Sequence, residues 1–190
     1  RNPHMLSRSA CGSSSGSGAA MSLRLASLAV GTETNGSIIC PASINGVVGF
    51  KPTVGLLSRT HIVPISFSQD TAGPMTSNVQ DAWLMTAVMA GEDASDSATE
   101  NTASHQPNMP SSKMLATDLK GKRIGVVKYR QGDNPHVLEV YESALNQLRA
   151  SGATLVNISD FSQPDSFWAD SYNVLLSEFH HSINEYLSGS

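Results

Sequence analysis

The sequence predicts a mixed α/β fold, and two patterns carry this prediction. A short apolar strand at residues 28–33 lies between segments with helical composition, and a strand–helix–strand pattern occupies residues 122–159. The chain has 190 residues, of which 39% are apolar and 15% charged. That length accommodates one domain of roughly 100–200 residues with a hydrophobic core.

The charge balance and the distribution of apolar residues argue against two classes of partner. The chain carries 12 basic and 16 acidic residues and a formal charge of −4, without a basic run. This balance argues against a direct nucleic-acid partner. No apolar stretch approaches the ~20 residues that a membrane-spanning helix needs. We therefore expect neither nucleic acid nor a membrane as a direct partner.

The two cysteines, Cys11 and Cys40, fit no CxxC or zinc-ligand spacing. This favours free thiols and predicts no metal site. The chain begins without Met or a signal region, so the sequence does not exclude a targeting segment upstream. A cytoplasmic protein is favoured, with a secreted or periplasmic protein as the alternative.

Elements in the first third of the chain are short. Residues 19–26 favour a helix, and LAVGTE at residues 28–33 favours a buried strand that leads into a turn at residues 34–36. Pro41 is suited to the first position of a short helical turn. Residues 46–74 alternate apolar stretches with Gly and Pro, which predicts loops around a site.

A helix is predicted at residues 79–90, with Ser77 or Asn78 as its N-cap and Gly91 as its stop. Residues 92–118 are first acidic and then rich in Ser, Thr, Asn and Pro. Because they lack periodicity, we expect an exposed loop or linker there.

The remainder of the chain is predicted to have a structural role. KRIGVVKY at residues 122–129 favours a strand, residues 137–150 an amphipathic helix, and TLVNIS at residues 154–159 the next strand. Residues 165–187 predict a long helix with a broad apolar face.

Two serine-bearing segments are the candidates for chemistry. They are CGSSSGSGAA at residues 11–20 and GTETNGSIICPAS at residues 31–43. Ser13 and Ser37 are 24 positions apart, which leaves room for one helix and one strand that return the chain to the same place. The Asn35–Gly36 pair favours a tight turn, which can present successive N–H groups beside Ser37 as an oxyanion hole.

Other interpretations of these segments are weaker. The Ser/Gly run resembles a flexible linker in composition, but it leads directly into helical sequence and a strand. Gly12–Gly16 fits a GxSxG elbow that would make Ser14 the nucleophile, yet no buried strand precedes it. Neither a phosphate-binding loop nor an SxxK site is present, because both need a lysine at a fixed position.

The histidines give no clear site. His180 and His181 lie near Glu178, but neighbours on a helix point about 100° apart and no HExxH motif is present. A polar helix face is the better interpretation. His61 belongs to the loop-rich part, where a pocket and the open surface are equally good assignments.

Taken together, these motifs resemble the amidase signature family. The resemblance is carried by CGSSSGSGAA, by GTETNGSIICPASINGVVGFKPT and by SFSQDTAGPM, and it covers residues 1–91 closely. The amino-acid sequences of these motifs are most similar to those of the peptide amidase branch, whose members remove the amide at the C-terminus of a peptide. The family implies a mixed sheet covered by helices on both sides, with no metal or organic cofactor.

The resemblance also implies roles for individual residues. Ser37 matches the nucleophile, and Ser13 matches a proton-relaying serine held by a cis peptide, with Gly12 and Ser14 in its supporting loop. The oxyanion hole matches the N–H groups of Thr34, Asn35, Gly36 and Ser37. The expected reaction is attack of Ser37 on an amide carbon, loss of ammonia, and hydrolysis of the acyl-enzyme.

The chain also departs from the family. The family's catalytic lysine lies upstream of the Ser/Gly loop, so it is not in this chain, and Lys51 matches a position with a structural role. Because the C-terminal portion is also missing, the sequence indicates an internal piece, which we expect to be inactive by itself. Ser15, Asn35 and Ile39 replace the residues usual at their positions, which predicts a changed acyl pocket.

The expected organisation follows from the resemblance: an amidase signature core with both serine loops at residues 1–91, the loop or linker at 92–118, and an α/β continuation of the same domain at 119–190. The expected substrate is a small-molecule or peptide amide, most similar to a peptide C-terminal amide. The alternatives are the glutaminase-type subunit of an amidotransferase and a non-catalytic member that serves as a binding or structural protein.

Overall fold

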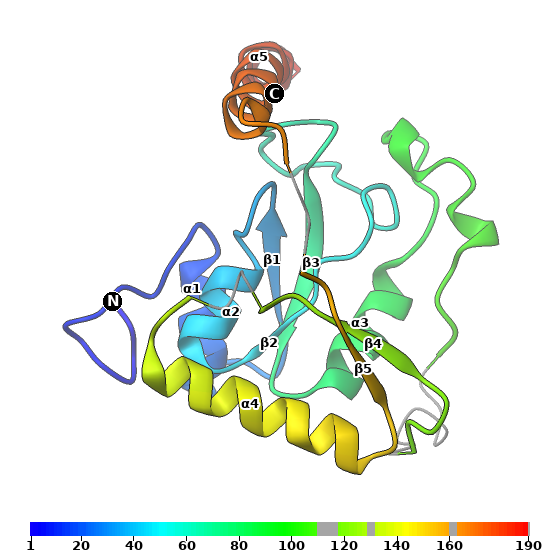
Figure 1. Cartoon of the computed structure of the whole chain (residues 1–190). Coiled ribbons are helices and arrows are strands. Elements are labelled where there is room, and N and C mark those ends of the chain that lie inside the picture. The colour runs from blue at the N-terminus through cyan, green and yellow to red at the C-terminus, as the bar shows by residue number, and fades with distance from the viewer. Residues whose placement is uncertain (110–117, 129–131, 160–162, 190) are drawn as a thin grey trace. The chain divides into compact units, whose positions relative to one another are not determined.

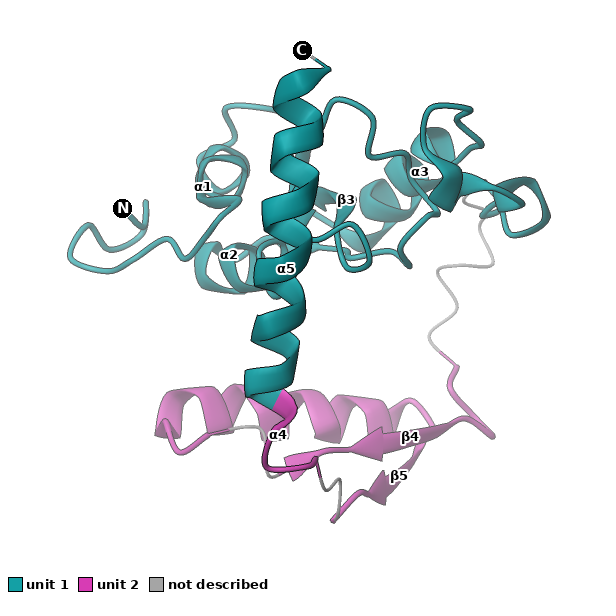
Figure 2. Ribbon diagram, turned by 90° about the horizontal axis from the view of Figure 1, so that it is seen from above, with its two compact units in different colours: residues 1–110, 168–190 teal, residues 111–167 magenta. Residues whose placement is uncertain are grey.

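The structure is a computed structural model, and it describes residues 1–109, 118–128, 132–159 and 163–189. The chain divides into two compact units (Figure 2). Unit 1 contains Arg1–Pro110 and Trp168–Ser190, and unit 2 contains Ser111–Phe167. Each unit combines strands and helices, so the predicted mixed α/β class is confirmed.

Unit 1 is built on a three-stranded antiparallel sheet with the order β1-β3-β2 (Figure 1). Its strands are β1 (Ala29–Glu33), β2 (Val48–Gly49) and β3 (Thr71–Thr76). In the β1–β3 ladder, Glu33 pairs with Thr71. This register places the residues that follow β1 beside the residues that precede β3.

The central strand, β3, was not expected, because it lies partly within the segment predicted as loops. Its six residues are all buried. Gly73 and Pro74 make its sequence a poor strand candidate, because proline cannot donate to a ladder and glycine weakens a strand. In this sheet Gly73 allows the carbonyl of Phe50 to approach closely, and the Pro74 carbonyl accepts from the Phe50 N–H at 3.0 Å.

Three helices accompany this sheet. They are α1 (Ser15–Ser22), α2 (Ile39–Asn45) and α3 (Val79–Met89). The helix at α1 therefore begins four residues earlier than predicted, inside the Ser/Gly run. Pro41 is the third residue of α2 and not its first. For α3 the prediction is confirmed: the Asn78 side chain accepts from the Asp81 N–H at 2.9 Å.

Two small apolar clusters form the core of unit 1. Met21, Ile38, Ala42 and Met75 pack together and join α1, α2 and β3. Leu57, Ala72 and Ala90 form the second cluster. Because Ile38 follows Ser37 directly and is fully buried, the first cluster anchors the chain next to the candidate nucleophile.

Part of the segment predicted as an exposed loop packs within unit 1. It contains two 3₁₀ helices, at Ser97–Thr99 and Thr102–Ser104, and the side chains of Asp96, Thr99 and Thr102 are buried. Residues 110–117 of that prediction lie outside the described residues.

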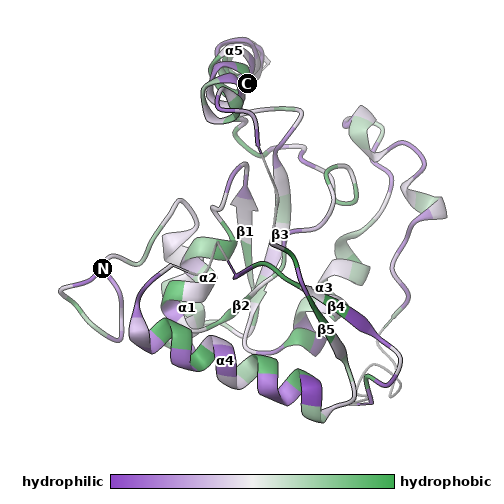
Figure 3. Ribbon diagram, in the orientation of Figure 1, coloured by the Kyte–Doolittle hydropathy of each residue, from purple (hydrophilic) through white to green (hydrophobic). Residues whose placement is uncertain are grey.

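Unit 2 contains the predicted strand–helix–strand pattern. The parallel strands β4 (Arg123–Val126) and β5 (Thr154–Asn157) are joined through α4 (Pro135–Ala150). Hydrophobic and hydrophilic residues alternate along α4 (Figure 3), and the Asn134 side chain caps it by accepting from the His136 N–H at 3.0 Å. Residue 129, the end of the predicted first strand, is outside the described residues.

The last helix, α5 (Phe167–Ser188), matches the long helix predicted at residues 165–187. Several of its large apolar side chains are solvent-exposed, Trp168 by 58% and Tyr172 by 60%. Among the described residues, no helix is long and apolar enough to cross a membrane.

The close packing at Gly73 gives the first prediction. In Gly73→Ala, the new Cβ would collide with the Phe50 carbonyl and lie 2.8 Å from Cδ1 of Ile38. We expect the free energy of unfolding to fall by about 1–3 kcal/mol, as measured by urea denaturation. Gly91→Ala is the control, because its Cβ meets nothing within 4 Å. Equal stability of the two variants would contradict this description of the sheet.

Candidate functional site

The structure brings the two serine segments together in unit 1. Ser13 and Ser14 lie just before α1, and Ser37 lies in the turn between β1 and α2. The Ser14 N–H donates to the Ser37 carbonyl at 3.2 Å. The return of the chain that the 24-residue spacing predicts is therefore present, and it uses α1 and β1.

The loop before α1 is fixed against β1. The peptide bond between Gly12 and Ser13 is cis, as the resemblance implied. The Ser14 hydroxyl donates to the Thr32 carbonyl and accepts from the Thr32 N–H, both at 3.0 Å. Because the backbone of β1 occupies this hydroxyl, the geometry argues against Ser14 as the nucleophile of a GxSxG elbow.

The prediction of free thiols is wrong. Cys11 and Cys40 form a disulfide with a Cα–Cα distance of 5.9 Å. Their separation of 29 residues matches no local cysteine motif, and only the return of the chain through α1 and β1 brings them together. The disulfide joins the residue before Gly12 to a residue three positions after Ser37. It therefore links the two candidate catalytic loops covalently.

Hydrogen bonds from a buried asparagine reinforce this link. The Asn45 side chain, on α2, is fully buried and donates to the Ala10 carbonyl at 2.9 Å and to the Pro41 carbonyl at 2.7 Å. The start of the chain is thus tied to α2 both by a covalent bond and by hydrogen bonds.

The turn at residues 34–37 is held at its far end by Glu33. This carboxylate is 6% exposed, and it accepts from the N–H groups of Ile38 at 2.8 Å and Ile39 at 2.9 Å. Gly36 has a φ of +90°, a conformation that glycine adopts readily. Within the described residues, no hydrogen bond takes up the N–H groups of Asn35, Gly36 and Ser37. These groups are available to a ligand.

A second buried carboxylate holds the start of the turn. Asp70 is 8% exposed and accepts a hydrogen bond from the Thr34 hydroxyl. A pocket of about 310 Å³ adjoins it and is lined in part by Arg59, His61 and Phe67. Of the two assignments open for His61, a pocket and the open surface, the structure shows both, since the exposed ring lines this pocket.

Charged groups beside this pocket are paired. Arg59 donates from Nη2 to Oδ1 of Asp96 at 2.6 Å; this hydrogen bond raises the pKa of Arg59 and lowers that of Asp96, although burial opposes both shifts. Hydrogen bonds from the hydroxyls of Ser58 and Thr60 lower the pKa of Asp93 to about 2. These carboxylates stay ionised at neutral pH, so they accept protons poorly and serve to fix the loop.

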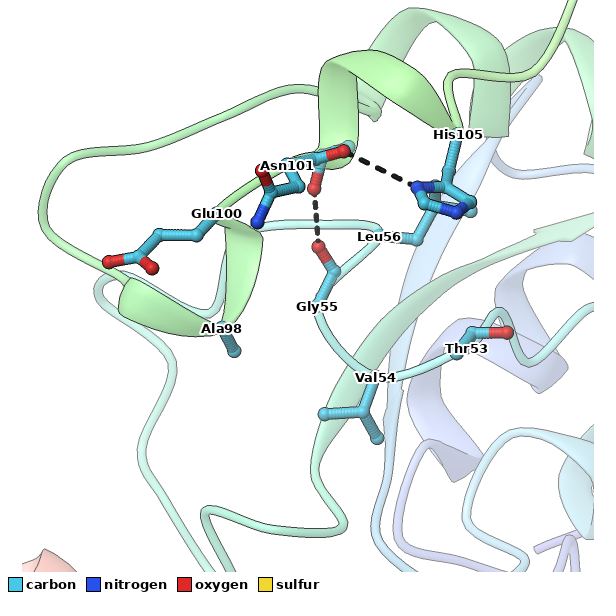
Figure 4. Close-up of a pocket in the computed structure, with 9 residues that line it drawn as sticks. Thr53, Val54, Gly55, Leu56, Ala98, Glu100, Asn101 and His105 are labelled. Carbon is cyan, nitrogen blue, oxygen red and sulfur yellow. Dashed lines mark hydrogen bonds between the residues drawn. The ribbon is translucent and has the colours of Figure 1, made fainter.

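Another pocket has a volume of about 510 Å³ (Figure 4). It is formed by residues 53–56 and 98–105, and the Thr102 hydroxyl crosses it to donate to the Gly55 carbonyl at 2.8 Å. None of the predicted site residues lines it.

The remaining candidates behave as structural groups. His181 lies 3.4 Å from Glu185 on the exposed surface of α5, while Glu178 accepts from Ser66 and Ser68. No cluster of three metal-ligating side chains occurs in the part of the chain that the structure describes. Lys51 donates from Nζ to the Pro52 carbonyl at 3.2 Å.

Comparison with known proteins identifies the family. The family model described as Amidase matches residues 1–189 of this chain. The chain belongs to the amidase family.

The chain is similar in sequence or structure to several known proteins. A probable amidase from Arabidopsis thaliana is 38% identical over 98% of this chain and 36% of its own length. A glutamyl-tRNA(Gln) amidotransferase subunit from Leptospira interrogans is 40% identical over 86% of the chain and 32% of its own length. The crystal structure of the peptide amidase from Stenotrophomonas maltophilia matches with a TM-score of 0.82 and 44% identity, over 100% of this chain and 39% of that one.

This chain therefore spans about a third of the length of the amidases that it matches. Within that third, it contains the two serine loops of the amidase signature. The structure adds groups that the motifs had not singled out: the Cys11–Cys40 disulfide and the buried carboxylates of Glu33 and Asp70. The sequence signal for Glu33 is its position at the end of a predicted buried strand. Asp70 has no such signal, because β3 was not predicted as a strand.

The disulfide gives the second prediction. Replacing Cys11 by Ser should lower the free energy of unfolding by about 2–4 kcal/mol, because the unfolded chain loses the constraint of a closed loop. Urea denaturation measures this change. Cys40→Ser and the double variant should show the same loss, because each breaks the same bond. Additive losses, or none, would contradict a disulfide in the folded protein.

Proposed function

We propose that the protein carrying this chain hydrolyses carboxylic amides through an acyl-enzyme on Ser37, with a peptide C-terminal amide as substrate. The observation that carries this proposal is the meeting of the two serine loops, where the Ser14 N–H donates to the Ser37 carbonyl and the Cys11–Cys40 disulfide closes the link. Membership of the amidase family supports the reaction class.

In this mechanism Ser37 attacks the amide carbon. A serine hydroxyl is a weak nucleophile until a base removes its proton. Ser13 relays that proton to a lysine supplied from outside this chain, and returns a proton to the leaving ammonia. Water then hydrolyses the ester on Ser37 and releases the acid.

The turn at residues 34–37 stabilises the negative charge that forms on the amide oxygen. Donors fixed before the reaction reduce the energy of a tetrahedral intermediate, because they need no reorganisation when charge develops. The N–H groups of Asn35, Gly36 and Ser37 are not used by other described residues, which supports this role. The Thr34 N–H belongs to the same turn.

The identity with the peptide amidase from Stenotrophomonas maltophilia favours a peptide amide as substrate. A second candidate is the glutaminase subunit of an amidotransferase, supported by the 40% identity to the amidotransferase subunit from Leptospira interrogans. The two functions differ in the amide that they accept, so a substrate panel separates them.

The third prediction tests this function in the full-length protein. Ammonia release is measured with C-terminally amidated dipeptides, free glutamine and simple aliphatic amides. We expect release from the amidated dipeptides, a loss of about 10⁴-fold or more in Ser37→Ala, and a loss of about 10²–10⁴-fold in Ser13→Ala.

Ser43→Ala is the matched control, because Ser43 lies exposed on α2 in the same motif and should keep its activity. Preference for glutamine would favour the amidotransferase function. If Ser37→Ala releases ammonia as fast as the unchanged protein, Ser37 is not the nucleophile. If the folded, unchanged protein releases none, the chain belongs to a non-catalytic member of the family.

A further inference from the structure

Asp70 lies where the loop before β3 meets the turn that carries Ser37. It directly precedes Thr71, the first residue of β3, and Thr34 directly follows Glu33, the last residue of β1. Because Glu33 and Thr71 pair in the antiparallel ladder, Thr34 and Asp70 leave the sheet side by side. The sheet itself therefore sets the approach of these two side chains.

Both oxygens of the Asp70 carboxylate accept hydrogen bonds. Thr34 donates its hydroxyl to Oδ1, and the N–H groups of Ile65 and Ser66 donate to Oδ2 at 2.7 and 2.8 Å. The Asp70 N–H donates in return to the Ser66 carbonyl at 2.8 Å. A buried carboxylate with this set of hydrogen bonds is held in one orientation, so it can fix the group that it binds.

The loop that supplies Asp70 is fixed from the other side by α5. Glu178 accepts from the hydroxyls of Ser66 and Ser68 and from the Ser68 N–H. Figure 1 shows α5 beside the loop that leads into β3. Burial raises the pKa of Glu178, but these hydrogen bonds outweigh it and lower the pKa overall. The carboxylate therefore remains ionised and continues to hold the loop at neutral pH.

The turn at residues 34–37 is thus held at both ends by buried carboxylates. Glu33 accepts from the N–H groups of Ile38 and Ile39 at the far end, and Asp70 accepts from Thr34 at the near end. Between these two anchors, the N–H groups have little freedom to rotate away from a substrate oxygen.

We propose that Asp70 is a positioning residue for amide hydrolysis: through the Thr34 hydroxyl it fixes the direction of the turn whose N–H groups bind the substrate oxygen. This inference rests on the function proposed above. Asp70 does not touch the substrate in this account, and its effect reaches the reaction through Thr34. Displacing a group that positions the substrate by about 1 Å can lower the rate about 10²-fold.

The test uses the full-length protein and the best amide of the substrate panel. Thr34→Val removes the hydroxyl while keeping the size and branching of the side chain. We expect kcat to fall about 10- to 100-fold and KM to change less than about 3-fold, because the donors act more strongly in the transition state than on the bound substrate. Thr34→Ser restores the hydroxyl and should recover most of this loss.

Asp70→Asn completes a double-mutant cycle. The oxygen of the asparagine amide can still accept from the N–H groups of Ile65 and Ser66. Its NH₂ group then faces Thr34 and cannot accept the hydrogen bond that the Thr34 hydroxyl donates to Asp70. The single variants should lose similar amounts of kcat, and the double variant should lose no more than the worse of the two, within about 3-fold, because both changes break one contact.

Thr60→Val is the matched control for a general loss of rigidity when a hydrogen bond between threonine and a carboxylate is removed. The Thr60 hydroxyl also donates to a carboxylate, that of Asp93, at 2.5 Å, but outside the turn. We expect Thr60→Val to keep the kcat of the unchanged protein. Three results would overturn the inference and leave the proposed function standing. They are an equal loss of kcat in Thr60→Val and Thr34→Val, a double variant whose loss of kcat is the product of the two single losses, and a Thr34→Val variant with unchanged kcat. An unchanged protein that hydrolyses no amide overturns both.

Discussion

The antiparallel pairing of β1 with β3 is the constraint on which the site depends. The free edge of β1 receives the serine loop, because the backbone of Thr32 both donates to and accepts from the Ser14 hydroxyl. The end of β1 sets the turn, since Glu33 pairs with Thr71 and its carboxylate binds the start of α2. The candidate nucleophile is thus placed by a strand and not by its own flexible loop.

Covalent and polar contacts then make this arrangement specific. The Cys11–Cys40 disulfide and the Asn45 side chain both tie the start of the chain to α2. A loop rich in Ser and Gly would otherwise lose much conformational entropy on folding. By limiting the freedom of the unfolded chain, the disulfide reduces the cost of ordering the Ser/Gly run.

Local patterns predicted much of this structure. The helix that becomes α3 is fixed by its periodicity and the Asn78 cap, and unit 2 follows from its strand–helix–strand pattern. The motifs also identified the two serine loops, which the fold brings together. These features depend on residues close in the sequence, so periodicity and turn preferences are sufficient to find them.

What the sequence did not predict depends on contacts between distant residues. The strand β3 contains Gly73 and Pro74, which argue against a central strand until the approach of Phe50 is known. The disulfide spans 29 residues, and Asp70 meets Thr34 across 36. The disulfide depends on the return of the chain through α1 and β1, and the Thr34–Asp70 contact on the strand register; no local pattern reports either.

In the proposed mechanism, Ser37 carries the acyl group during turnover. To detect it, the full-length protein is mixed with an activated ester of a good substrate acid, the reaction is stopped with acid within its first turnover, and the adduct is mapped by peptide mass spectrometry. We expect an added acyl mass on the peptide that contains Ser37, and none in Ser37→Ala. An adduct on another residue, or turnover with no covalent adduct, would contradict it.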